Sequence, residues 1–292
     1  MNILFIHGRA QEEYTQDTLL RTWTSALKES FVQTGLDYPN FELALPYYGK
    51  ELIRQRDIYK KDIEDGILQM RAAKKQDKLE ELEKKLLLKM LENAGVSQKE
   101  ITDEVNSAQQ TKGAENLGIS IVMARLIDRH FKSVANGCVK KRTEDVVTYL
   151  IAPKAREVIN KFYLDALTPK PTVIIAHSMG TIIAYDILRN LDKKQFDIRG
   201  LITLGSPLGV ESVQRQLMPP PVYPKALKGS WVNMFDPRDI VALNPLDPRN
   251  FRVDNRQIIN HEITNTSDNR HKISEYLSNP LISETLMDMI NE

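Results

Sequence analysis

Residues 172–185 read TVIIAHSMGTIIAY, and this stretch decides the fold. An apolar run of strand length leads into a helical pattern, so Ser178 is expected on a sharp turn from strand to helix. Such a turn needs small residues two positions before and after the serine, because its backbone is strained and the flanking elements pack closely. Ala176 and Gly180 meet that need, although the usual residue at the first position is glycine. The turn predicts a nucleophilic serine; an ordinary small-residue turn is the alternative.

Five further apolar runs of strand length occur outside this stretch, and helical patterns separate them. With 172–176, the expected strands are 3–6, 41–45, 201–204, 231–235 and 258–263. Continuous apolar runs alternating with helices are typical of a parallel sheet that is covered on both faces. The sequence therefore predicts an α/β fold with a mostly parallel sheet of about six strands and helices on both faces.

A helical insertion is predicted between the second and third strands. None of the 14 prolines falls within residues 47–152, and 11 of the 19 residues in 74–92 are charged. Within 74–92 the apolar residues recur at helical spacing: Leu79, Leu82, Leu86 and Met90. Ser97 and Glu100 form the pattern of a helix-starting capping box. We expect a core of residues 1–48 and 144–292, with a helical cap insertion at 49–143.

The edges of this insertion allow several interpretations. A helix over about 144–167 should kink or restart at Pro153. The apolar residues of 117–131 either pack the cap onto the core or line a groove for an acyl chain, if the cap lies over the carboxyl ends of the strands. Residues 50–110 read as a helical hairpin, which would suit a homo-oligomer or a protein partner. A protein that is regulated, or inactive, within an assembly is therefore a rival hypothesis.

An acid and a histidine follow Ser178 in the order that a nucleophilic serine on such a turn requires, each beyond an expected strand. Asp239 comes 61 residues after Ser178, and His271 comes 32 residues after Asp239. Asp236 is the alternative acid, but Asp236-Pro237 reads as a turn opener, so Asp239 is preferred. The expected catalytic residues are Ser178, Asp239 and His271.

Two backbone N–H groups are expected to hold an oxyanion, one from Met179 after the nucleophile and one from Arg9 after the first strand. The Arg9 guanidinium would more simply form a surface ion pair than bind an anionic substrate. The remaining histidines are expected to be structural; they are His7, His130, His177 and His261.

Four motifs together resemble the α/β-hydrolase superfamily, and more narrowly its bacterial esterase- or lipase-like members. They are His7-Gly8-Arg9, His177-Ser178-Met179-Gly180-Thr181, Gly205-Ser206-Pro207-Leu208, and the segment with Trp231, Asn233, Asp236-Pro237-Arg238-Asp239 and Val241-Ala242. The resemblance covers residues 1–48 and about 144–292. It implies an α/β-hydrolase fold and hydrolysis of a small-molecule or lipid ester through a Ser-Asp-His triad and an acyl-enzyme. A peptidase or amidase with the same triad stays open.

Composition excludes several other classes of function. The chain has 292 residues with 40 basic and 39 acidic side chains, and a net charge of +1 gives no footprint for nucleic acid. No apolar run approaches the roughly 20 residues that cross a bilayer, and no secretory leader is visible, so a cytoplasmic protein without a transmembrane segment is expected. The single cysteine, Cys138, reads as an incidental or buried thiol. No metal or cofactor is expected.

Overall fold

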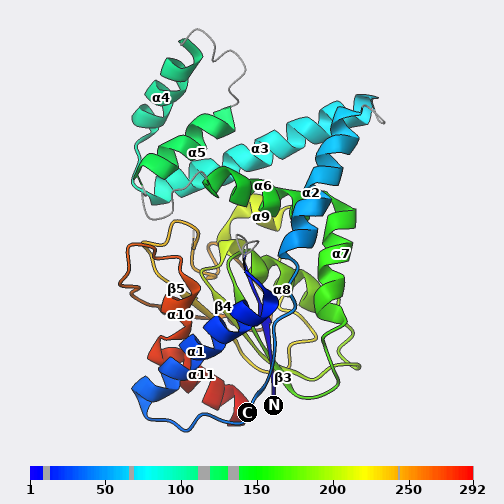
Figure 1. Cartoon of the computed structure of the whole chain (residues 1–292), viewed down its shortest axis with the longest axis vertical. Helices are drawn as coiled ribbons and strands as arrows, with labels where there is room; N and C mark the ends of the chain where they lie inside the picture. Colours follow the sequence, from blue (N-terminus) through cyan, green and yellow to red (C-terminus); the bar gives the residue numbers. More distant parts are fainter. Residues whose placement is uncertain (9–13, 66–68, 111–118, 131–137, 243, 292) are drawn as a thin grey trace. The chain divides into compact units, whose positions relative to one another are not determined.

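A six-stranded sheet, in which every strand runs parallel to its neighbours, occupies the centre of one part of the chain (Figure 1). The computed structural model describes residues 1–8, 14–65, 69–110, 119–130, 138–242 and 244–291. The strands are β1 (Asn2–Ile6), β2 (Glu42–Ala44), β3 (Thr172–His177), β4 (Ile198–Leu204), β5 (Trp231–Phe235) and β6 (Ile259–Glu262). All six expected runs form strands, and β2 and β6 are shorter than expected, so the predicted α/β class is confirmed.

The order of the strands is β2-β1-β3-β4-β5-β6. Ile3 of β1 pairs with Leu43 of β2 on one side and with Val173 of β3 on the other. After β1 the chain adds β2 on one side of it and later β3 on the other side. The strand order therefore reverses between β1 and β3. Open parallel sheets bind ligands beyond the carboxyl ends of their strands at such a reversal. Ser178 follows β3 directly at that place.

Successive strand residues point to opposite faces of a sheet, and in this sheet residues on both faces are buried. One face packs on α1 (Gln16–Thr34), α10 (Ile273–Leu277) and α11 (Pro280–Asn291), which contact one another in a single apolar cluster. The alternate strand residues, such as Leu4 and Ile174, are buried as well. Helix α8 (Met179–Asn190) contacts β1 and β3 and buries ten consecutive residues from Met179 to Leu188. Short helices η1 (Pro207–Gly209) and α9 (Glu211–Gln214) follow β4.

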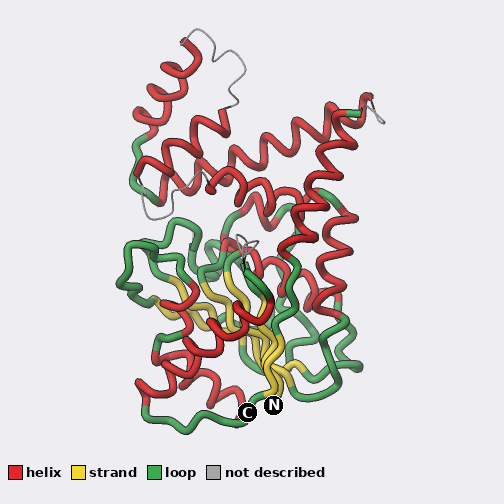
Figure 2. The backbone as a smooth tube through the Cα atoms, viewed as in Figure 1, coloured by secondary structure: helices red, strands yellow, loops and turns green. Residues whose placement is uncertain are grey.

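The contacts divide the chain into two compact units. The α/β unit comprises Met1–Gly49 and Val158–Glu292, and the helical unit comprises Lys50–Glu157. The helices of the second unit are α2 (Gly49–Glu64), α3 (Gln69–Asn93), α4 (Gln98–Gln110), α5 (Ile119–His130) and α6 (Cys138–Ile151), and α7 (Pro153–Leu164) runs across the boundary in sequence. In Figure 2 the strands belong to the α/β unit, whereas the described part of the helical unit is helix and connecting loop.

Helix starts in the helical unit follow local sequence signals. The Ser97 hydroxyl accepts a hydrogen bond from the Glu100 amide at 3.2 Å, which caps α4. Proline cannot continue a helix, and α6 ends at Ile151 before α7 restarts at Pro153, as expected. Helix α6 begins at Cys138, six residues before the helix start expected at residue 144. The expected boundary between residues 143 and 144 therefore falls inside α6. Helix α6 packs on α3 and α5 and belongs to the helical unit.

Helix α5 supplies much of the apolar interior of the helical unit. Its buried apolar residues are Val122, Met123, Ala124, Leu126 and Ile127, and the helix contacts α3, α4 and α6. These side chains therefore pack within the helical unit. Leu117 and Phe131, the ends of the expected groove segment, lie outside the described residues, and so does the side chain of Cys138.

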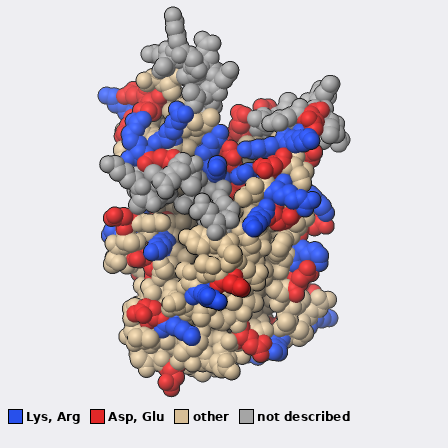
Figure 3. Space-filling model, in the orientation of Figure 1, with Lys and Arg blue, Asp and Glu red and all other residues tan. Residues whose placement is uncertain are grey.

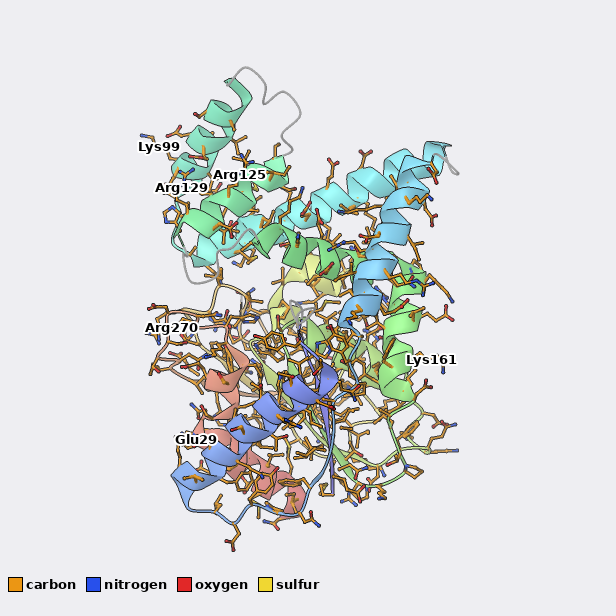
Figure 4. The ribbon with its side chains drawn as sticks, viewed as in Figure 1. Glu29, Lys99, Arg125, Arg129, Lys161 and Arg270 are labelled. Carbon is orange, nitrogen blue, oxygen red and sulfur yellow. The ribbon has the colours of Figure 1, made fainter. Side chains whose placement is uncertain are left out.

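Charged side chains of both signs are interspersed over the helical unit on the face shown in Figure 3. Lys99 of α4 and Arg125 and Arg129 of α5 extend from this unit (Figure 4), and Arg129 pairs with Glu104. Such exposed pairs give a solvated surface and contribute little to stability. Among the described residues, no helix combines the length and apolarity needed to cross a membrane.

Candidate functional site

Ser178 lies on a tight turn between β3 and α8 with unusual backbone angles, φ 56° and ψ −128°. A residue with a Cβ rarely adopts a positive φ, so the backbone of Ser178 is strained and must be held by its surroundings. The Ser178 amide donates to the Leu204 carbonyl at 3.0 Å, and the Ser178 carbonyl accepts from the Thr181 hydroxyl at 2.7 Å. The neighbouring strand and the first helical turn thus fix both sides of the serine.

Glycines let the backbone of β1 approach this turn. A Cβ on Gly180 would lie 2.1 Å from the Ile6 carbonyl oxygen, which no side chain could tolerate. A Cβ on Gly8 would lie 2.8 Å from the Ser178 Cβ. The requirement for a small residue at position 180 therefore comes from the close passage of β1, and Gly8 allows the loop after β1 to contact the serine.

Three of the residues singled out in the sequence form a hydrogen-bonded row. The Nε2 atom of His271 lies 2.8 Å from Ser178 Oγ, and its Nδ1 atom lies 2.7 Å from Asp239 Oδ2. An ionised carboxylate can only accept, so Nδ1 carries the proton and, in the neutral ring, Nε2 accepts from the serine hydroxyl. The three side chains come from the loops after β3, β5 and β6, at the carboxyl ends of the strands.

Asp239 is fully buried in this row. Burial alone would raise the pKa of its carboxyl, but the His271 ring, the Val241 amide and the Tyr276 hydroxyl together hold that pKa below its ordinary value. The Val241 amide donates to Oδ1 at 2.9 Å, and the Tyr276 hydroxyl donates to Oδ2 at 2.8 Å. Asp239 therefore stays ionised, and a buried negative charge faces His271.

Asp236, the alternative acid, has different partners. Its carboxylate accepts hydrogen bonds from the Arg238 guanidinium at 3.0 Å and from the backbone N–H of Asn265 at 2.7 Å. The Asn265 side chain in turn donates to the Arg270 carbonyl, directly before His271. Arg270 is labelled in Figure 4, in the loop between β6 and α10. Asp236 thus ties the loop that carries His271 to the end of β5, and Asp239 is the carboxyl in contact with the imidazole.

Gly205 directly follows β4 and lies beside the histidine–carboxylate pair. Its φ of 55° lies in the region that glycine adopts readily, and a Cβ there would lie 3.1 Å from His271 Nδ1 and 3.0 Å from Asp239 Oδ2. A Cβ at position 205 would therefore displace these groups by a few tenths of an ångström.

His7 at the end of β1 is buried and neutral. Burial lowers the pKa of its imidazole to about 4. Its Nδ1 atom donates to the Gly8 carbonyl at 2.6 Å, and its Nε2 atom accepts from the Tyr48 amide at 3.3 Å. The Tyr48 hydroxyl donates to the His7 carbonyl at 2.9 Å. His7 therefore fixes the loop after β1, where the second oxyanion donor is expected.

The two expected oxyanion donors are described to different extents. Met179 is the buried first residue of α8, and the first N–H groups of a helix have no acceptor within the helix. The positive end of the helix dipole lies at the same place and favours negative charge there. Arg9 lies outside the described residues.

Two further residues support the row: His177, which was expected to be structural, and Tyr276, which the sequence did not single out. The Nε2 atom of His177 donates to the His271 carbonyl at 3.0 Å, and its ring lies 4.5 Å from the His271 ring. Tyr276 in α10 donates to Asp239. In the sequence Tyr276 stands in a short apolar helix pattern beside Leu277, where a tyrosine reads as core. Its position five residues after His271 was the only available signal.

The remaining histidines lie elsewhere. His130 of α5 pairs with Glu100 at 2.8 Å on the surface of the helical unit, and His261 is half-buried in β6. Among the described residues, no group of three or more His, Cys, Asp or Glu side chains is arranged to hold a metal ion.

No protein-family model matches this chain, and no curated protein or solved structure matches it. The chemistry of the site therefore has to follow from its own residues. A hydroxyl, an imidazole and a buried carboxylate stand in a hydrogen-bonded row beside a helix N-terminus. Such a row can move the serine proton to the imidazole while the carboxylate stabilises the resulting cation.

Proposed function

We propose that this chain is a serine hydrolase that cleaves carboxylic esters through an acyl-enzyme. The observation that carries the proposal is the row Ser178–His271–Asp239, with contacts of 2.8 Å and 2.7 Å and with the serine on a strained turn at the carboxyl end of β3. A serine hydroxyl is a weak nucleophile unless an adjacent base removes its proton. The contacts of His271 with Ser178 and with Asp239 support His271 as that base and Asp239 as the group that orients it.

The reaction has two halves. Ser178 Oγ attacks the ester carbonyl carbon while His271 Nε2 takes its proton, and His271 then returns the proton to the departing alcohol. Water then gives a proton to His271 and attacks the acyl carbon. The bond to Ser178 Oγ breaks, His271 returns that proton to Oγ, and the carboxylic acid leaves. In both halves the Met179 N–H donates to the oxyanion of the tetrahedral intermediate. Asp239 keeps its charge and stabilises the imidazolium each time.

A fluorophosphonate probe tests the nucleophile directly. We expect one adduct, on Ser178 as located by mass spectrometry, and its loss in Ser178→Ala. Ser25→Ala, at an exposed serine of α1, serves as the matched control and should label like the parent chain. An adduct elsewhere, or persistent labelling of Ser178→Ala, would refute the assignment of the nucleophile.

The two carboxyls three residues apart test the acid. Asp239→Asn should slow labelling by roughly 10³–10⁴-fold, because an amide opposite His271 favours the wrong tautomer. Asp236→Asn should slow labelling by about tenfold or less, because Asp236 acts only through the Asn265–Arg270 loop. Equal losses in the two variants would contradict the separate roles.

Ester and amide substrates of the same acyl group separate the esterase from a peptidase. We expect hydrolysis of p-nitrophenyl esters and much slower hydrolysis of the matching p-nitroanilides. A rate that rises from acetyl to octanoyl esters would indicate a lipid-like substrate, and strict preference for acetyl would indicate a small one. Faster cleavage of the anilides would replace the esterase proposal with an amidase.

A further inference from the structure

Tyr276 and His271 both donate to one oxygen of Asp239. The Tyr276 hydroxyl lies 2.8 Å and His271 Nδ1 lies 2.7 Å from Oδ2, while the Val241 amide occupies Oδ1. Both the Asp239 side chain and Tyr276 are fully buried. Three donors thus hold a carboxylate that has no exposure to water.

The direction of the Tyr276 hydrogen bond is fixed by its second partner. The Asp236 amide donates to the Tyr276 oxygen at 3.2 Å, so the phenol proton is left to point at the Asp239 carboxylate. Burial and the nearby Asp239 charge raise the pKa of the phenol, so it keeps its proton. Tyr276 is therefore a permanent donor that joins helix α10 to both ends of the loop from Asp236 to Asp239.

We propose that Tyr276 is a positioning residue that shares Asp239 Oδ2 with His271 and thereby sets the pH at which the Ser178–His271 pair becomes a working base. The inference rests on the proposed function and deepens it. A phenol that donates to Oδ2 draws negative charge away from the imidazole, which weakens the stabilisation of the protonated ring. Its removal concentrates the carboxylate charge on His271, and the imidazole then keeps its proton to higher pH.

Two other titratable groups in the described part of the chain lie beside this cluster, His177 and Asp236. His177 packs against both rings, with centroids 4.5 Å from His271 and 5.9 Å from Tyr276. The charge of Asp236 is paired with Arg238. Removal of the Tyr276 hydroxyl breaks its bond to Asp239 and also the bond that it accepts from the Asp236 amide. A role of the Asp239 bond therefore requires that a stronger phenol donor, which keeps both bonds, shifts the pH profile in the opposite direction.

The test is the pH dependence of fluorophosphonate labelling in the full chain and in Tyr276→Phe. We expect the acid limb of the profile to move up by about half a pH unit, the scale of one neutral hydrogen bond, with roughly threefold slower labelling at pH 6. Tyr185→Phe is the matched control, because the buried Tyr185 hydroxyl bonds Val222 and Arg189 away from the site. It should lower stability and leave the profile in place.

A second substitution keeps the inference testable if Tyr276→Phe does not fold. Site-specific 3-fluorotyrosine at position 276 preserves the shape and makes a stronger donor, so the acid limb should move to lower pH. Opposite shifts for the two changes would support the proposal. Profiles that coincide with the parent chain, with only stability altered, would overturn it and leave Tyr276 as a packing residue.

Proton NMR separates this inference from the proposed function. The downfield Nδ1 proton of His271, assigned by its loss in His271→Ala, can be titrated in the resting protein without turnover. A higher titration midpoint in Tyr276→Phe supports the positioning role even if no probe labels Ser178. Labelling of Ser178 with an unchanged midpoint supports the hydrolase and refutes the role of Tyr276.

Discussion

The imidazole of His7 stacks on the ring of Tyr48 with centroids 4.2 Å apart and planes 11° apart, and the Tyr48 amide donates to its Nε2 atom. Because that nitrogen must accept, the folded protein has no place for a proton on it. The pKa of His7 is accordingly lowered to about 4. Tyr48, in the segment after β2, therefore makes this hydrogen bond to the loop after β1 only while His7 is neutral.

His7 should make the α/β unit sensitive to acid. The pKa of its imidazole is about 4 in the fold and near 6.5 when unfolded, so its contribution is complete above pH 6.5 and is lost as the pH falls toward 4. The loss should reach about 3 kcal/mol in the free energy of unfolding. Urea unfolding from pH 8 to 4 should show this slope in the parent chain and in the surface control His130→Gln. His7→Gln should remove it, and an unchanged slope there would show that another group titrates.

Ser178 should carry a cost in stability that glycine relieves. At φ 56° and ψ −128° a Cβ is strained, and alanine keeps that Cβ whereas glycine does not. Both Ser178→Gly and Ser178→Ala should lose labelling, but the glycine variant should be more stable than the alanine variant by about 1 kcal/mol. Thermal unfolding of the two variants measures this. Greater stability of the alanine variant would mean that the turn is not strained.

Gly205→Ala should affect activity more than stability alone would explain. The new Cβ would press against both His271 and Asp239, so labelling should fall by at least about tenfold as their contact is displaced. Gly35→Ala is the matched control, because Gly35 also has a positive φ, of 69°, but has open space around its Cβ position. It should cost about 1 kcal/mol and leave labelling unchanged. Similar labelling losses in both variants would point to general destabilisation.

Glu83 should make the helical unit less stable as the pH rises. Its side chain is buried in α3, and burial followed by the Glu144 charge raises its pKa to about 7. A raised pKa means that the stabilising contribution is complete below about pH 4.5 and is lost as the pH rises through 7. Glu83→Gln should therefore raise the free energy of unfolding at pH 8 by about 2–3 kcal/mol.

The control for Glu83 lies on the same helix. Glu81 is exposed and pairs with Lys85, so Glu81→Gln should change stability only slightly. Hydrogen exchange of α3 and α6 amides at pH 5 and pH 8 reports the helical unit by itself. Equal protection of the Glu83→Gln variant and the parent chain at pH 8 would contradict the prediction.

The approximate positions of the six strands, the restart at Pro153 and the turn at Ser178 could be predicted from the sequence. These depend on features within a few residues, namely apolar runs, the missing proline N–H and small residues around a strained position. Local patterns therefore sufficed for the class of fold and for the candidate nucleophile. Local patterns were less reliable at the start of α6. This helix packs on α3 and α5, and it begins six residues before the expected residue 144.

The folded structure is needed to show which carboxyl contacts His271 and which residues support that contact. Asp236 and Asp239 stand three residues apart in one loop. The local sequence favours Asp239, but the partners of each carboxyl depend on how the loop after β5 meets the loop after β6. The contact of Tyr276 also depends on the tertiary structure, because the packing of α10 brings the Tyr276 hydroxyl to Asp239. Contacts between residues 32–93 positions apart depend on strand order and loop path, which no local periodicity records.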